Sequence, residues 1–295
     1  MLNLEQLSDL LEQNRAAATA RVKEFAIGGK PFAFNSRPAI MGVVNLSADS
    51  WYRESVCLTT KAAVQRGKTL SAQGADVVDV GAESTLAHAA RVDDAGQNSK
   101  LIPVIKELRA LNVLVSVETY QPTVTRACLE AGANVLNLTG TESSDELFRM
   151  VADHDAAVII CYVQGKNVRE VADFDLSTDP IPMMHDYFAR QIESAQRNGV
   201  EKIFIDPGLG FYYRNLQDSA VRVRHQMKIF LNTFRLRTLG FPICHALPHA
   251  FEYFGEEVRC AEPFFAVLAS LGKTDLFRTH EVPRIKAVLD TLRVY

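Results

Sequence analysis

The sequence predicts an α/β protein, a (β/α)8 TIM barrel with an N-terminal helix and a β-hairpin ahead of its first strand. From about Ser36 onward, short apolar runs alternate with longer amphipathic segments, the pattern of a strand followed by a crossover helix. Eight such runs occur, rich in Val, Ile and Leu without alternation, as in parallel strands covered on both faces. At 295 residues the chain has a usual barrel length, and no proline- or serine-rich linker interrupts it. We therefore expect one domain over residues 1–295.

The first 35 residues are expected to form an extension of the barrel. Up to about residue 20 they carry leucines at helical spacing, which predicts an extra helix. Residues 25–34, with Gly28 and Gly29 at their middle, predict a β-hairpin because paired glycines suit its tight turn. We expect this hairpin to plug the N-terminal mouth of the barrel.

The barrel strands are expected at residues 39–45, 76–81, 113–119, 134–138, 157–162, 202–206, 241–245 and 275–279. Helices are expected between them, among other places at residues 61–73, 97–110, 122–131, 185–198 and 282–292. Four glycines stand where a helix should stop before the next strand: Gly74, Gly132, Gly199 and Gly240. Eight strands alternating with helices favour a closed barrel over an open doubly wound sheet.

Composition and charge exclude several classes of protein. The formal net charge of −3 gives no long-range field that would attract nucleic acid or an anionic membrane. The N-terminus lacks the pattern of a signal peptide, and no segment approaches the roughly 20 apolar residues that cross a bilayer. The five cysteines are scattered and include no C-x-x-C pair, which indicates reduced thiols rather than disulfides or a zinc site. We expect a cytoplasmic protein that binds neither nucleic acid nor membranes.

Polar residues follow the strands at their carboxyl ends, where a barrel carries its reactive groups. Glu118, Asn137 and Asp206 lie on the third, fourth and sixth strands. A carboxylate pairs with adjacent N–H donors of a ring, and a nearby amide satisfies a donor and an acceptor together. These residues therefore suit a pterin or another guanidine-like heterocycle. Gln164, which follows the fifth strand, is assigned to the same pterin-binding set.

A second group comes from the first and eighth strands, which adjoin when a barrel closes. Asn45 ends the first strand, while Arg278 and His280 end and follow the eighth. An Arg and a His suit a diphosphate, and the side-chain oxygen of Asn45 suits Mg²⁺. We therefore expect a diphosphate site next to the heterocycle, with Asn45 as the metal ligand.

Each of these residues also has a structural explanation when taken alone. An Asp before Pro-Gly is a common turn residue, and an Asn or His near a loop or helix start can cap it, which applies to Asp206, Asn45 and His280. Glu118 alone is more typical of a solvated network at a barrel mouth, and Glu83 is as readily a brace for its own loop as a ligand contact. His245 and His249 are more typical of structural histidines than of metal ligands. The functional interpretation depends on so many such residues coinciding at strand ends.

Six segments resemble, in the same order along the chain, the signatures of the dihydropteroate synthase family: residues 40–50, 74–85, 115–120, 131–137, 206–211 and 278–282. This family condenses a dihydropterin methyl diphosphate with p-aminobenzoate in folate biosynthesis and releases diphosphate. The resemblance implies that the Glu118 group holds the pterin and that the Asn45 group supplies the catalytic contacts to the diphosphate and its Mg²⁺. It further implies that Thr85 helps to bind the diphosphate and that the protein is a homodimer through its last helices.

The sequence departs from the family pattern at particular loops. Ser47-Ala48 stands where Thr-Pro is usual, and Leu86-Ala87-His88 stands where Arg-Pro-Gly is usual. Glu118 replaces an Asp and reaches one methylene further. After the seventh strand the family has Ser-Arg-Lys-Ser, in which Lys contacts the pterin, whereas residues 247–251 read Leu-Pro-His-Ala-Phe. In that register Ala250 replaces the lysine, at a cost on the order of 2–3 kcal/mol of binding energy.

Two other functions are alternatives to the synthase hypothesis. A pterin-binding regulatory or partner subunit without synthase activity would explain the lost lysine. A pterin-dependent methyl-transfer barrel that works with a corrinoid protein is a further candidate. The presence of Asn45, Arg278 and His280 argues against methyl transfer, which has no diphosphate to hold.

Overall fold

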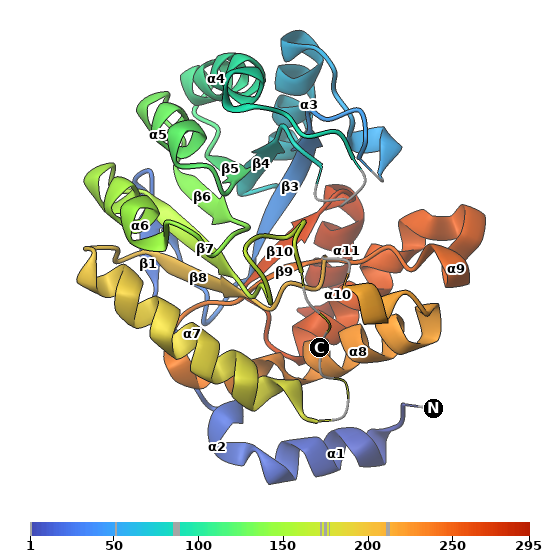
Figure 1. The fold of residues 1–295 in the computed structure, drawn as a ribbon. Coiled ribbons are helices and arrows are strands. Elements are labelled where there is room, and N and C mark those ends of the chain that lie inside the picture. The colour runs from blue at the N-terminus through green and yellow to red at the C-terminus, as the bar shows by residue number, and fades with distance from the viewer. Residues whose placement is uncertain are drawn as a thin grey trace.

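The computed structural model describes residues 2–50, 52–84, 89–171, 173, 176, 178–210 and 213–295, and it forms the predicted barrel (Figure 1). Eight parallel strands follow one another in the order β8-β7-β6-β5-β4-β3-β10-β9. The two ends of this sheet meet where Ile205 pairs with Ile243 and the Ile205 N–H donates to the Pro242 carbonyl at 3.1 Å. The prediction of a closed (β/α)8 barrel is therefore confirmed.

The strands begin and end close to the predicted positions: β3 (Ala39–Asn45), β4 (Val77–Gly81), β5 (Val115–Thr119), β6 (Val135–Leu138), β7 (Ala157–Cys161), β8 (Ile203–Asp206), β9 (Cys244–Ala246) and β10 (Leu276–Thr279). The seventh barrel strand, β9, is displaced from the expected residues 241–245. Pro242 has no N–H to donate, and the Ile243 N–H donates to the Asp275 carboxylate at 2.8 Å instead of joining the ladder. Pairing with β10 therefore starts only at Cys244.

The helices that surround the barrel are α3 (Thr60–Ala72), α4 (Asp94–Ala110), α5 (Pro122–Glu130), α6 (Ser144–Asp153), α7 (Pro180–Arg197), α8 (Ser219–Asn232), α10 (Ala261–Leu271) and α11 (Val282–Leu292). Shorter turns are η1 (Arg53–Ser55), η2 (Arg214–Leu216), η3 (Thr233–Leu239), α9 (Phe251–Phe254) and η4 (Gly255–Cys260). Helix α7 starts earlier than the expected residue 185, because Asp179 caps it and Pro180 occupies its first turn. The four glycines expected after helices all have positive φ, at 110°, 102°, 86° and 82°.

The N-terminal extension contains the predicted helix and hairpin. The helix forms in two pieces, α1 (Leu4–Gln13) and α2 (Arg15–Ala18), and the hairpin consists of β1 (Phe25–Ile27) and β2 (Lys30–Phe32). Gly28 and Gly29 make the turn with φ of 54° and 81°. The hairpin packs its buried side chains among those at the strand starts inside the barrel, and the rings of Phe34 and Phe204 lie 5.2 Å apart. One end of the barrel is thereby closed, and the strand ends at the other face remain for a site.

Most of the remaining core lies between the strands and the helices around them. Four of the five cysteines are buried, and all five are free thiols. Over the described parts of the chain, no helix combines the length and apolar character that a membrane crossing requires.

Candidate active site

A cavity of about 360 Å³ opens at the carboxyl ends of the strands, a size within the usual range for small-molecule sites of roughly 300–1,000 Å³. Six of the eight residues predicted from the sequence line it: Asn45, Glu118, Asn137, Asp206, Arg278 and His280. Thr85 lies outside the described residues. Gln164 is not among the lining residues, and its amide donates to the Tyr162 hydroxyl at 2.7 Å.

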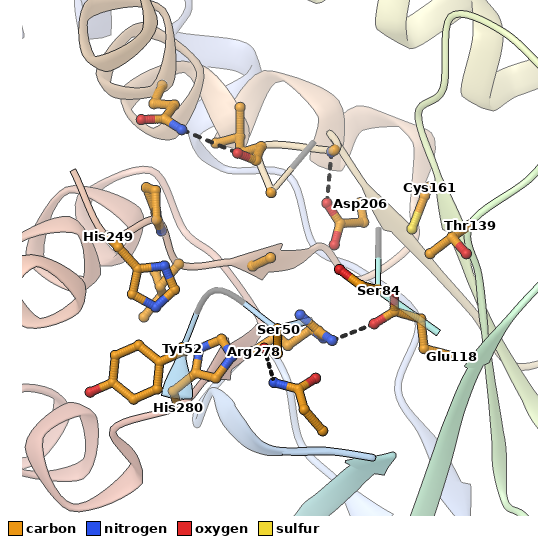
Figure 2. Close-up of a pocket in the computed structure, with 18 of the residues that line it drawn as sticks. Ser50, Tyr52, Ser84, Glu118, Thr139, Cys161, Asp206, His249, Arg278 and His280 are labelled. Atoms are coloured by element: carbon orange, nitrogen blue, oxygen red, sulfur yellow. Dashed lines mark hydrogen bonds and ion pairs between the residues drawn. The ribbon is translucent and has the colours of Figure 1, made fainter. Parts of the chain in front are cut away.

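Arg278 lies at the centre of this cavity (Figure 2). It stands between the residues expected to bind the pterin and the other residues expected to bind the diphosphate. Its Nε donates to Oδ2 of Asp79 at 2.8 Å, and one Nη donates to Oε2 of Glu118 at 2.5 Å. Burial alone would lower the pKa of Arg278, but these two carboxylates outweigh it and raise the pKa above its ordinary value. Arg278 therefore stays charged and ties the expected diphosphate region to the expected pterin region.

Asp79 is a functional candidate that the sequence reasoning missed. It lies in the middle of β4, is fully buried, and accepts a hydrogen bond from the Asn137 amide at 3.3 Å. Its Oδ1 atom is also buried and has no hydrogen-bond partner among the described residues. The available signal was an Asp inside the otherwise apolar run Val77–Gly81, because a charge in a strand covered on both faces requires a partner.

The carboxyl groups of Asp206 and Glu118 have perturbed acidity. Burial raises the pKa of Asp206 to about 6, although the Gly208 N–H, 2.7 Å from its Oδ1, opposes the shift. Burial also raises the pKa of Glu118 to about 7 against the opposing charge of Arg278. The contact to Gly208 is the turn contact given above as the structural alternative for Asp206. The same residue also lines the cavity. Both carboxyl groups line the cavity and offer acceptors to N–H donors of a bound ring.

Asn45, the last residue of β3, has a side-chain amide whose oxygen can serve as a ligand. Its Nδ2 donates to the hydroxyls of Ser50 at 2.8 Å and Ser55 at 2.6 Å. These two contacts orient the amide, so that Oδ1 is the atom left for a ligand in the cavity that Asn45 lines. An amide oxygen is a hard ligand of the kind that Mg²⁺ prefers.

His249 and His280 lie on the side of the cavity away from Asp206 (Figure 2), and both approach the buried Glu262. The His280 Nδ1 lies 2.9 Å and the His249 Nε2 lies 3.3 Å from Oε1 of Glu262. Burial would raise the pKa of Glu262, but the two nearby imidazoles of His249 and His280 outweigh it and hold the pKa well below its ordinary value. Burial lowers the pKa of His280 to about 4, so its imidazole is neutral beside an ionised carboxylate.

The two histidines of the seventh-strand segment differ in their surroundings. His245 is fully buried, and its Nε2 lies 2.8 Å from the Thr233 hydroxyl, as expected for a structural histidine. His249 instead lines the cavity. Its ring stacks on Tyr52 with centroids 4.9 Å apart.

The loop after β9 has no amine where the family motif has one. Ala250 lines the cavity with a left-handed backbone, φ 45°. Within the described part of the chain, the lining residues include no lysine, and the only arginines among them are Arg222 and Arg278. Arg222 pairs with Glu252 at 2.5 Å and donates to the Leu216 carbonyl at 3.0 Å. Arg222, on α8, is therefore already paired with Glu252 of α9 where it borders the cavity.

Glu83 is held mainly by contacts within its loop region. Its Oε1 lies 3.0 Å from the Arg169 guanidinium and accepts from the Val92 N–H at 3.1 Å, while Oε2 accepts from the Tyr120 hydroxyl at 3.0 Å. Both carboxylate oxygens of Glu83 therefore have partners, as expected if Glu83 braces its loop. Glu83 also borders the cavity.

Comparison with known proteins gives consistent matches. A family model described as pterin binding enzyme matches residues 41–244. A dihydropteroate synthase of Streptococcus pyogenes is 30% identical over 276 residues, 88% of this chain and 98% of that protein. The solved structure of Xanthomonas albilineans dihydropteroate synthase with 4-aminobenzoic acid is similar at 27% identity and a TM-score of 0.76, covering 94% of this chain and 98% of that chain. The same enzyme in complex with 7,8-dihydropteroate is 26% identical with a TM-score of 0.73, covering 92% and 97%.

Proposed function

Since the chain belongs to the dihydropteroate synthase family of pterin-binding enzymes, we propose that it is a transferase of folate biosynthesis that condenses a dihydropterin methyl diphosphate with p-aminobenzoate or a related nucleophile and releases diphosphate. The observation that carries this proposal is the strand-end cavity, in which carboxyl, amide and guanidinium groups converge on one ligand-sized space. A similar enzyme whose structure was solved with 7,8-dihydropteroate supports the same choice of product.

The pterin end of the substrate is assigned to Asp206, Asn137 and Glu118. The ionised Asp206 accepts two adjacent N–H bonds from the ring, a charge-assisted pair that fixes the plane of the heterocycle. The Asn137 amide, oriented by its bond to Asp79, offers a carbonyl acceptor to the same ring. Glu118 is drawn toward Arg278, so its acceptor position depends on this ion pair.

The diphosphate end is assigned to Arg278, His280 and Asn45, with Thr85 as a further donor. Arg278 brings a fixed positive charge and His280 brings a ring N–H. Mg²⁺ fits next to them, because the serine contacts of Asn45 leave its Oδ1 as a hard ligand. Bound there, Mg²⁺ supplies charge neutralisation for the departing diphosphate.

The reaction needs positioning more than proton transfer. The amine nitrogen bonds to the methylene carbon as the bond from this carbon to the diphosphate oxygen breaks, and the electron pair departs with the diphosphate. The pterin ring, held by Asp206 and Asn137, delocalises the positive charge on the carbon, and Arg278 stabilises the negative charge that develops on the leaving group. The nitrogen then loses its proton to water, so no dedicated base is required.

The altered loop after β9 bears on the second substrate. Ala250 and His249 occupy the loop in which the family's lysine and serine are expected, and they supply no ammonium group. We therefore assign specificity for the nucleophile to this loop. Of the two arginines among the described lining residues, Arg222 is the one not assigned to the diphosphate, and we assign it to a carboxylate on the aromatic amine, which would compete with its contact to Glu252.

The proposed activity is tested by diphosphate release. Purified protein with Mg²⁺ is expected to release diphosphate from the pterin substrate when p-aminobenzoate or another aromatic amine is supplied, and the Arg278→Met variant is expected to release none. Pterin binding without diphosphate release, under every amine tried, would favour a binding subunit and reject the transferase.

We also propose a cytoplasmic homodimer. The free cysteines are in keeping with a reducing compartment. Phe264, Val267 and Leu271 are 41%, 36% and 54% exposed and are spaced along α10 so as to share one face. Such a row of exposed apolar side chains is typical of a surface that a partner covers.

A further inference from the structure

Three residues that can bind a transition metal meet beside the cavity although they come from separate elements. His249 lies in the loop after β9, Glu262 lies in the first turn of α10, and His280 directly follows β10. One ligand atom from each lies within 4.8 Å of the others. Two histidines and one carboxylate form a common protein ligand set for zinc and similar ions.

The spacing of these atoms matches the size of a metal site. Bonds of roughly 2.0–2.2 Å in a tetrahedral arrangement place neighbouring ligand atoms about 3.4 Å apart. Oε1 of Glu262 lies 3.3 Å from the His249 Nε2 and 2.9 Å from the His280 Nδ1. These two distances differ by at most about half an ångström from the tetrahedral value, and the two imidazole nitrogens lie within 4.8 Å of each other.

The other oxygen of Glu262 is already fixed. Its Oε2 accepts hydrogen bonds from the Thr279 hydroxyl and from the backbone N–H groups of His280 at 3.1 Å and Glu281 at 3.2 Å. Such contacts to the remote oxygen orient ligating carboxylates in metalloproteins. They direct Oε1 toward the two histidines.

The charge of this cluster calls for a cation. Glu262 is fully buried, and over the described residues its only ion-pair partners are His249 and His280, with no Lys or Arg. The His249 Nε2 is buried as well, and despite its nearness to Glu262 it has no hydrogen bond of acceptable geometry. A divalent ion held by these three groups would supply the fixed positive charge that the described residues do not place beside Glu262.

We propose that His249, Glu262 and His280 bind a divalent transition-metal ion, Zn²⁺ or an ion with the same ligand preference, distinct from Mg²⁺ on Asn45. Imidazole nitrogens select such ions over Mg²⁺, which prefers oxygen ligands. Because His249 and His280 line the cavity, the fourth coordination position faces it and is open to water or to an anionic oxygen of a ligand. With the metal on Nδ1, the proton of His280 resides on Nε2.

The site is tested on the full chain after treatment with a chelator. Calorimetric titration with Zn²⁺ alone is expected to give one site per chain that excess Mg²⁺ does not occupy, and Co²⁺ is expected to show the visible absorption of a tetrahedral nitrogen–oxygen site. His249→Ala and Glu262→Gln are expected to weaken Zn²⁺ binding at least about 100-fold. His249 is a loop residue, so its removal tests the site even where Glu262→Gln lowers stability.

The matched control is His185→Ala, which removes a histidine on α7 with a side chain 39% exposed, and it is expected to leave Zn²⁺ affinity unchanged. Two results would overturn the proposal: a chelated protein that takes up neither Zn²⁺ nor Co²⁺, or uptake that persists unchanged in His249→Ala. Either would identify the cluster as a hydrogen-bonded histidine–carboxylate network. Neither readout requires turnover, so failure of the metal site is distinguishable from failure of the transferase.

Discussion

Arg278 and the carboxyl groups around it account for much of what the cavity can do. One guanidinium contacts Asp79 and Glu118, while Asp206 stands across the cavity with a raised pKa. Among the described residues at the centre of the cavity, these three carboxyl groups share the one guanidinium of Arg278. The centre of the cavity is therefore prepared for a ligand that brings N–H donors, and a pterin is such a ligand.

Asp206 should make the stability of the protein depend on pH. Its pKa in the folded state is about 6 against an ordinary 3.8, so between these values the folded protein holds the proton more tightly than the unfolded chain. Stability from this group therefore falls as pH rises from about 4 to about 6 and stays low above that. Asp206→Asn has no carboxyl to titrate and so does not lose this stability. The difference in free energy of unfolding between Asp206→Asn and the wild type should therefore shift in favour of the variant by about 1–3 kcal/mol from about pH 4 to about pH 8.

Urea denaturation at the two pH values measures this difference. Glu193→Gln, which alters an exposed carboxyl on α7, is the control and should show no such change. A difference between Asp206→Asn and the wild type that does not vary with pH would contradict the raised pKa.

Removing Arg278 should destabilise the barrel as well as stop catalysis. Arg278→Met leaves Asp79 and Glu118 buried without their cation, a loss on the order of 3–5 kcal/mol in the free energy of unfolding near neutral pH. Arg37→Met is the matched control, because the Arg37 side chain is 61% exposed and its contact to Asp76, at 3.6 Å, is a surface ion pair. Its loss should lower the free energy of unfolding by less than about 1 kcal/mol. Equal effects of the two variants would show that the central ion pairs do not support the fold.

At the scale of elements, the hairpin β1–β2 acts as the floor of the barrel. Phe34 is 4% exposed and lies 5.2 Å from both Phe25 and Phe204 by ring centroids. Phe34→Ala should lower the free energy of unfolding by about 3–5 kcal/mol. Leu4→Ala, at an 83% exposed position on α1, should change it by no more than about 0.5 kcal/mol. Thermal or urea unfolding of both variants decides the matter, and a small effect of Phe34→Ala would mean that the hairpin is dispensable.

The strands and the site residues show how much of the structure could be predicted from the sequence. Apolar runs and helix-ending glycines placed seven strands within two residues, because burial on both faces leaves a local pattern. Strand β9 was misplaced because its start depends on the Asp275 carboxylate, a contact distant in the chain. In the site, strand-end residues were found by their position, whereas Asp79 was missed within its apolar strand. The meeting of His249 with Glu262 was not foreseen either, since α10 comes next to the loop after β9 only through tertiary packing.

At the scale of the whole molecule, the exposed face of α10 predicts self-association. We expect light scattering to give twice the chain mass of 32.7 kDa for the wild type. Leu271→Glu places a charge at the most exposed position of that face, at the carboxyl end of α10, and should yield the monomer with its fold intact by circular dichroism. A Leu271→Glu dimer, or a monomeric wild type, would contradict an interface at α10.

The closed barrel, its plugged floor and its polar mouth together support one central claim, that the strand-end cavity is a pterin site. Calorimetric titration with the dihydropterin methyl diphosphate in the presence of Mg²⁺ tests it most directly. One binding site per chain is predicted, with affinity at least about tenfold weaker in Asn137→Ala, a loss of about 1.4 kcal/mol, and unchanged in Glu193→Gln. Absence of binding to the folded wild type, or equal binding by Asn137→Ala, would contradict the account.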